Sequence, residues 1–132
     1  MLNKLLKRDT LDRDAYKQLT TGDLDDLPYG IIVVDPTGVI VGYNRAEAKK
    51  AGFARERVMG RNFFSEVAPC TQVKMFLGRF ETFVAQKASS VEPFEFVFPF
   101  ASGPQRVSIL FYRDLTAPDR ISIIVRREDD AA

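Results

Sequence analysis

Cys70 is the only cysteine in this chain of 132 residues, and it lies between two segments with helical periodicity. Before it, Phe63 and Val67 recur at helical spacing, and Pro69 then prevents a clean continuation because it lacks an N–H group. The pattern predicts that Cys70 lies at or near the start of an amphipathic helix over residues 72–86. The dipole of a helix start favours a thiolate, so the position suits a reactive sulfur. A lone cysteine is also a common small core residue, and the position alone leaves both interpretations open.

The chain contains no histidine. This absence removes the usual general base at neutral pH and the commonest metal and haem ligand. Cys–His and Ser–His–Asp machinery cannot be built, and with a single cysteine a structural zinc site is excluded as well. We therefore expect no metal site, and we expect that the protein is not an enzyme.

The composition is that of one globular domain. Hydrophobic residues make up 45% of the chain, and the formal net charge is +1, with no long run of one sign. This charge pattern lacks the basic surface of a nucleic-acid-binding protein. No apolar run is long enough for a membrane span, and the N-terminus lacks a signal-peptide pattern. The expected location is cytoplasmic, with no membrane association.

The alternation of apolar residues predicts a sheet of five strands. Residues 31–34 and 39–43 form a hairpin around a turn, and the last third of the chain reads as three further strands. In the first of these three, phenylalanines alternate along one face and Pro99 indicates an edge strand or a bulge. Between the two groups, residues 45–51 form a short helix with Asn44 as its N-cap.

This order predicts an α+β fold in which an antiparallel sheet carries helices on one face. Residues 1–23, which mix leucines with charges, are expected to form an N-terminal helical cap. Residues 24–128 would be the body of the domain, and residues 129–132 a frayed tail.

Two motifs carry a family resemblance. The segment Gly-Arg-Asn-Phe-Phe-Ser-Glu-Val-Ala-Pro-Cys-Thr, residues 60–71, resembles the chromophore-attachment segment of the photoactive yellow protein family. The segment Tyr43-Asn44-x-Ala46-Glu47 resembles the tyrosine and glutamate pair of that family. The likeness runs from Leu24 to Arg127, and the element order is similar to the PAS fold of its members.

The resemblance implies a blue-light photoreceptor. Cys70 would carry p-coumaric acid (4-hydroxycinnamic acid) as a thioester, and Tyr43 and a protonated Glu47 would each donate a hydrogen bond to its phenolate. Light would drive trans-to-cis isomerisation, Glu47 would give up its proton, and the domain would partly unfold and then recover in the dark. The implied pocket residues are Ile32, Ala51, Phe53, Phe63, Val67, Ala68, Pro69, Thr71, Phe98 and Phe100.

Three positions depart from the family pattern. Ala51 stands where many members have threonine, Phe53 where many have arginine, and Ser102 lies in a loop that often carries methionine. We expect these departures to alter the absorption and the rate of dark recovery.

Other interpretations stay open at this stage. Asn44 and Glu47 also have the spacing of a capping box, which would place Glu47 on the surface. The domain could be a PAS sensor or dimerisation module without this pigment, or less readily a flavin or haem protein. A signal would pass to an unidentified downstream protein, with the N-terminal helices as the expected contact surface and a possible site of homodimerisation.

Overall fold

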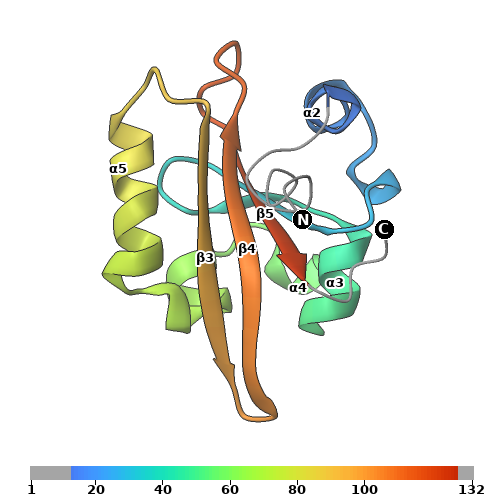
Figure 1. Ribbon diagram of the computed structural model, residues 1–132. Coiled ribbons are helices and arrows are strands. Elements are labelled where there is room, and N and C mark those ends of the chain that lie inside the picture. The colour runs from blue at the N-terminus through green and yellow to red at the C-terminus, as the bar shows by residue number, and fades with distance from the viewer. Residues whose placement is uncertain (1–12, 128–132) are drawn as a thin grey trace, which may run out of the picture.

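The computed structural model describes residues 13–127, which fold as a sheet with helical segments on both sides (Figure 1). Most of the predicted N-terminal cap and the whole predicted tail lie outside these residues. The strands are β1 (Gly30–Val34), β2 (Ile40–Tyr43), β3 (Val91–Phe100), β4 (Gly103–Arg113) and β5 (Ile121–Arg127). The α-helices are α2 (Arg13–Thr21), α3 (Arg45–Ala51), α4 (Arg55–Val58) and α5 (Arg79–Ala85). The short helical turns are η1 (Leu24–Asp26), η2 (Phe63–Val67), η3 (Pro69–Thr71) and η4 (Lys74–Gly78).

The five strands form one antiparallel sheet in the order β2-β1-β5-β4-β3. This confirms the predicted α+β class and the predicted number of strands. β3 is an edge strand, as Pro99 indicated, because an edge tolerates a residue that cannot donate to the ladder. The register of β3 against β4 runs without a shift past Pro99, and the irregularity lies instead between Val33 and Val34 in the pairing of β1 with β2.

The two faces of the sheet carry separate apolar clusters. The larger cluster lies between the sheet and the segments from α3 to α5, and Phe76 of η4 packs there against Phe111 of β4. On the opposite face, Tyr16 and Leu19 of α2 pack against a smaller cluster centred on Leu110. Figure 1 shows α5 and α2 on opposite sides of the sheet. In the part of the chain that the structure describes, no helix is both long enough and apolar enough to cross a membrane.

The helix predicted over residues 72–86 is interrupted. It consists of a π-helical turn, η4, followed by α5, and Val73 before η4 has an extended backbone with φ of −137°. Cys70 lies in the separate three-residue turn η3. The prediction of one continuous helix over residues 72–86, with Cys70 at or near its start, is therefore wrong. A hydrophobic stripe at helical spacing does not distinguish one helix from two turns that bury the same side chains.

Candidate functional site

Asn44 connects the two residues that the family motif singled out. It is fully buried between Tyr43, the last residue of β2, and α3, and its Oδ1 accepts the Glu47 N–H at 3.0 Å and the Ile31 N–H at 2.9 Å. Its Nδ2 donates to the carbonyls of Leu24 at 3.0 Å and Tyr29 at 2.9 Å. Asn44 is therefore the N-cap of α3, as predicted, and it also ties that helix to β1 and to the segment before β1.

Glu47 lies in the interior of the protein, only 5% exposed. The backbone N–H of Asn44, which a capping box would pair with the Glu47 carboxylate, donates to the Ile31 carbonyl at 3.0 Å. The surface capping-box interpretation is therefore wrong. Gly30 of β1 lies against the carboxyl group, and a side chain at that position would collide with Glu47 Oε1. The absence of a side chain at Gly30 therefore provides the space that the buried Glu47 carboxyl occupies.

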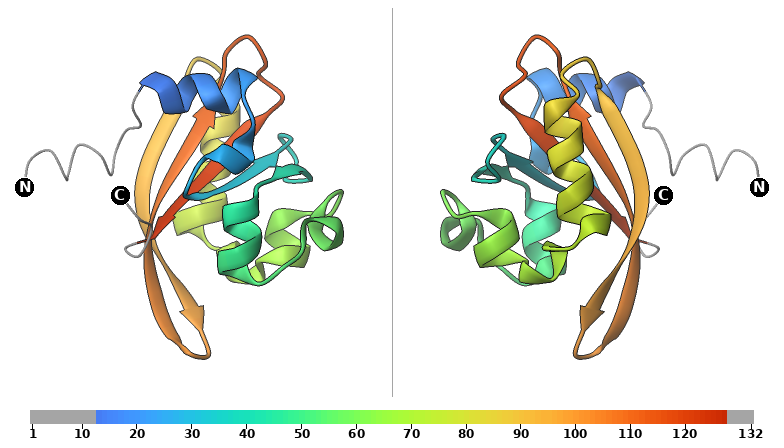
Figure 2. Two further views of the ribbon diagram at one scale, coloured as in Figure 1. Left: turned by 90° about the vertical axis from the view of Figure 1, so that its right-hand side faces the viewer. Right: turned by 90° about the vertical axis from the view of Figure 1, so that its left-hand side faces the viewer.

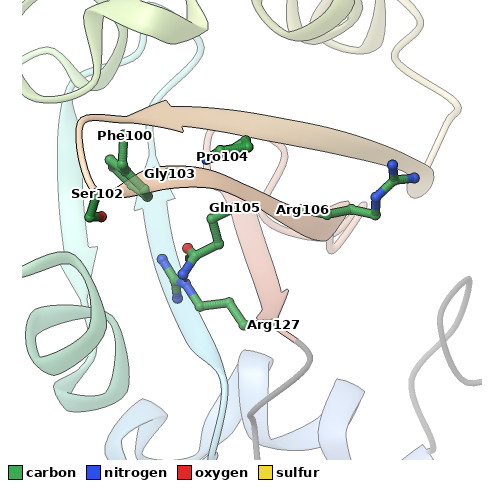
Figure 3. A pocket seen from close by; sticks show the side chains of 7 residues that line it. All are labelled: Phe100, Ser102, Gly103, Pro104, Gln105, Arg106 and Arg127. Atoms are coloured by element: carbon green, nitrogen blue, oxygen red, sulfur yellow. Dashed lines mark hydrogen bonds between the residues drawn. The ribbon is translucent and has the colours of Figure 1, made fainter.

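Arg127, the last residue of β5, forms a buried ion pair with Glu47. Nη1 lies 2.9 Å from Oε1 and Nη2 lies 3.4 Å from Oε2, and the two side chains are 3% and 6% exposed. Nε of Arg127 donates to Oε1 of Gln105 in β4 at 3.1 Å, and Figure 3 shows these two side chains next to each other. The two charges compensate each other away from water, where an unpaired charge is costly.

The sequence prediction did not include Arg127 in the site, although the sequence contains a signal for it. Ile121, Ile123 and Val125 alternate toward the larger cluster, and the same alternation places Arg127 on that buried face. A charged residue at a buried position of a strand requires a charged or polar partner. The pattern therefore indicates that Arg127 has an acidic partner, but it does not identify Glu47.

The Tyr43 hydroxyl is buried and has no hydrogen-bond partner among the residues that the structure describes. Burial raises the pKa of Tyr43 well above its ordinary value, the negative charge of Glu47 raises it further, and Arg127 lowers it. The phenol therefore keeps its proton and can act as a donor. A buried hydroxyl without a partner is uncommon and points to an acceptor that residues 13–127 do not supply.

Arg55 of α4 forms a hydrogen bond with the backbone of Tyr43. Its Nε donates to the Tyr43 carbonyl at 2.7 Å, and its Nη2 lies 2.9 Å from Oδ1 of Asp25 in η1. Hydrogen bonds from Arg45 and Arg55 lower the pKa of Asp25, so this carboxylate stays charged. Arg55 therefore connects the end of β2 to η1, which precedes β1 in the chain.

Cys70 is half-buried at the edge of the larger cluster. Burial raises the pKa of its thiol, whereas a hydrogen bond from its own backbone N–H lowers it less. The expectation of a thiolate stabilised by a helix start is wrong, because η3 has only three residues and its dipole cannot outweigh desolvation. The next residue, Thr71, is fully buried, and its hydroxyl donates to the Ala68 carbonyl at 2.6 Å.

The structure brings half of the expected pocket residues into one cluster. Cys70 shares it with Tyr43 and with five of the predicted residues, namely Ile32, Phe63, Val67, Ala68 and Phe98. Ala51 is half-buried and Pro69 is exposed. Phe53 and Phe100 are 43% and 45% exposed, although the Phe100 ring stacks on Phe98 with centroids 5.4 Å apart. The structure therefore leaves Phe53 and Phe100 at the rim.

A pocket of about 570 Å³ opens beneath the hairpin that joins β3 and β4, a hairpin that extends beyond the rest of the fold (Figure 2). It is lined by the hairpin residues 100 and 102–106 and by Arg127. Arg127 thus contacts this pocket and, at the same time, the buried Glu47. Figure 3 shows Arg127 among the residues that line this pocket.

Comparisons with known proteins identify the fold and the family of the chain. The PAS fold family matches residues 23–107. The chain is 37% identical over 114 residues to photoactive yellow proteins of Rhodothalassium salexigens and Halochromatium salexigens, covering 86% of this chain and 90% of each relative.

Among solved structures, the photoactive yellow protein domain of the sensor histidine kinase Ppr from Rhodospirillum centenum is similar. The TM-score is 0.75 at 44% identity, covering 88% of this chain and all of that domain. A PAS domain from the RpfR quorum-sensing receptor of Cronobacter turicensis is only 15% identical, with a TM-score of 0.62, and shares the fold alone. The family match, the extent of the similarity and the buried pair of Tyr43 and Glu47 lead to one conclusion: the chain belongs to the photoactive yellow protein family of PAS-fold light sensors.

Proposed function

We propose that this chain senses blue light through p-coumaric acid, bound as a thioester to Cys70 and held at its phenol end by Tyr43 and Glu47. When bound, this pigment supplies the absorption of blue light and a trans-to-cis isomerisation. The observation that carries the proposal is the buried Tyr43 hydroxyl, which has no acceptor among the described residues. A phenolate oxygen is a strong acceptor of the kind that this donor lacks. Relatives named photoactive yellow protein support the same assignment.

Each residue has a defined role in this proposal. Tyr43 donates its proton in a hydrogen bond and, because its pKa is raised, keeps that proton. Glu47 provides a second group that can carry a proton at a carboxyl oxygen in the interior. The apolar side chains around Cys70 exclude water from the space between the thioester and these two groups.

Attachment requires an activated acyl donor, such as an anhydride or a thioester of p-coumaric acid. The bond between Cys70 Sγ and the carbonyl carbon forms as the bond from that carbon to the leaving group breaks. The leaving group departs with the electron pair of the broken bond, and the thiol proton passes to solvent. No histidine is available as a base, so the reaction depends on the fraction of Cys70 that is already a thiolate.

We therefore expect the attachment rate to be strongly pH-dependent. Below the raised pKa of Cys70, the thiolate fraction and hence the rate rise by about tenfold for each pH unit. The half-maximal rate should fall at a higher pH than for a small thiol such as N-acetylcysteine with the same donor. Recording intact mass against time at several pH values measures both the slope of the rate with pH and the pH of the half-maximal rate. A midpoint below that of the small thiol would contradict the burial of Cys70 as the controlling effect.

The contacts of Asn44 suggest how a change at Glu47 is transmitted. Asn44 accepts from the Glu47 N–H and donates to the carbonyls of Leu24 and Tyr29, which lie in the segment between α2 and β1. A change in the charge of Glu47 therefore acts on a helix that holds the N-terminal segment. We propose that illumination loosens this segment, with partial unfolding and dark recovery. Faster proteolysis between residues 21 and 29 in the light than in the dark is the expected sign.

The decisive experiment combines an absorption spectrum with intact mass after incubation with activated p-coumaric acid. We expect a blue-absorbing band that bleaches reversibly, together with a mass increase of one acyl group. Both should be absent in Cys70→Ser, which keeps the size of the side chain but offers a weaker nucleophile. A reaction at lysines would persist in that variant. No band and no Cys70-dependent adduct would instead indicate a PAS module without this pigment.

A further inference from the structure

The ion pair of Glu47 and Arg127 gives the buried end of the site a net charge of zero. Arg127 contributes one positive charge from β5, Glu47 contributes one negative charge from α3, and both side chains are nearly inaccessible to solvent. Gln105 of β4 accepts from Nε of Arg127 and fixes the guanidinium plane. The guanidinium thus contacts both the buried carboxyl and Gln105, and Arg127 also lines the pocket under the hairpin.

This charge balance limits what the site can hold. A phenolate brought beside an intact carboxylate–guanidinium pair would leave one uncompensated negative charge in the interior, which is strongly unfavourable. If Glu47 takes up a proton instead, one phenolate faces one guanidinium and the site is neutral again. Without Arg127 the phenolate would lose this buried cation, and the neutral phenol would be favoured.

We propose that Arg127 is the counter-ion of the phenolate end of the site, so that Glu47 and the phenol oxygen share a single proton against its one positive charge. Arg127 acts here as a positioning residue and a fixed charge. The inference rests on the proposed function, because it assigns the charge balance of the same site. It also implies that a carboxylate formed at Glu47 is paired with Arg127 and is not stranded.

Other charged or titratable groups also lie near the pair in residues 13–127. Tyr43 is neutral, and its phenol keeps its proton. Gly30 of β1 and Gln105 of β4, which lie against the pair, cannot titrate. The charged groups on neighbouring elements include Arg106, exposed at the same pocket, and Asp25, which is engaged with Arg45 and Arg55 beside the start of α3. Lys49 and Lys50 of α3 are exposed, and Arg126 precedes Arg127 in β5, where alternation directs its side chain to the other face of the sheet.

The first test uses the pigment-free protein and infrared spectroscopy. We expect Glu47 to be a carboxylate in the native protein. In Arg127→Gln, Glu47 should become protonated and give the carbonyl-stretch band of a buried carboxylic acid. The double variant Glu47→Gln, Arg127→Gln should lack this band, which assigns it to Glu47. The same spectrum in native protein and in Arg127→Gln would overturn the proposal. This arm does not depend on pigment attachment.

The second test titrates the pigment-loaded protein in the dark by absorption. Arg127→Gln should raise the pKa of the bound phenol by about one unit or more, a tenfold loss of acid strength. Arg127→Lys, which keeps the charge, should move it less. Arg106→Gln is the matched control, because it removes a positive charge from the rim of the same pocket, and it should change the pKa little.

Glu47→Gln tests the second group at the phenol end. Glutamine can still accept from Arg127, so the fold should survive, but an amide is a weaker donor to the phenolate than a protonated carboxyl, and the phenol pKa should rise. A structural clamp without a charge role would leave the pKa unchanged in both Arg127→Gln and Glu47→Gln, and that result overturns the inference. Absence of any adduct on native Cys70 would overturn the proposed function instead, so the two failures are distinguishable.

Discussion

Replacing Arg127 by leucine is expected to lower the free energy of unfolding of the pigment-free protein by about 3–5 kcal/mol at neutral pH. The substitution removes the cation that lies 2.9 Å from Glu47 Oε1 and leaves a carboxyl group in the interior without its partner. It also deprives Gln105 Oε1 of the Arg127 Nε–H donor. The loss should exceed that of an exposed salt bridge such as Arg61 with Glu66, for which we expect at most about 1 kcal/mol.

The pH dependence of this loss has a definite sign. In Arg127→Leu the buried carboxyl binds a proton more tightly in the folded protein than in the unfolded chain, so stability falls as pH rises through that range. The deficit relative to the native protein should therefore shrink in acid. Urea titrations of both proteins at several pH values measure this difference in the free energy of unfolding.

A double-variant cycle provides the control for Arg127→Leu. Glu47→Leu combined with Arg127→Leu removes both charges and should recover a large part of the lost stability, because two apolar side chains then replace a buried ion pair. A double variant that is as unstable as the sum of the two single variants would contradict the ion pair as the cause. The deficit would then reflect packing alone.

Replacing Arg113 by methionine is expected to cost about 2–4 kcal/mol, because several backbone carbonyls lose their donor. Arg113 is 2% exposed at the end of β4, and its Nη2 donates to the carbonyls of Phe83, Gln86 and Ser89 at 2.9, 2.6 and 2.7 Å. The last carbonyls of a helix have no partner within that helix, and here one arginine satisfies carbonyls at and just beyond the end of α5. Its guanidinium also lies 4.5 Å from the centre of the Phe83 ring.

Arg106→Met is the matched control for Arg113→Met, because Arg106 lies on the same strand but is exposed. It should change the free energy of unfolding by no more than about 0.5 kcal/mol. Hydrogen exchange should show a second difference, with amides of α5 and of residues 86–90 exchanging faster in Arg113→Met alone. Equal stability of the two variants would show that solvent replaces Arg113 as the donor.

Local patterns were sufficient for most of the fold. The strands follow from alternation of apolar residues, and Asn44 is an N-cap because its side chain reaches an N–H only three residues away. Pro99 indicated an edge strand through its missing donor, which acts at the residue itself. Each of these signals depends on neighbours in the sequence. The motifs around Cys70, Tyr43 and Glu47 likewise identified the family from contiguous residues.

The tertiary structure decided the electrostatics of the site. Glu47 and Arg127 lie 80 positions apart, and no local pattern says which buried carboxyl meets which buried guanidinium. The pKa of Cys70 is raised and not lowered, because desolvation by the packed core exceeds the effect of a three-residue turn. The sequence by itself determined the strand order along the chain, the cap of α3 and the family, since these depend on short-range spacing. Burial and charge pairing depend on distances through space, and only the folded chain sets those.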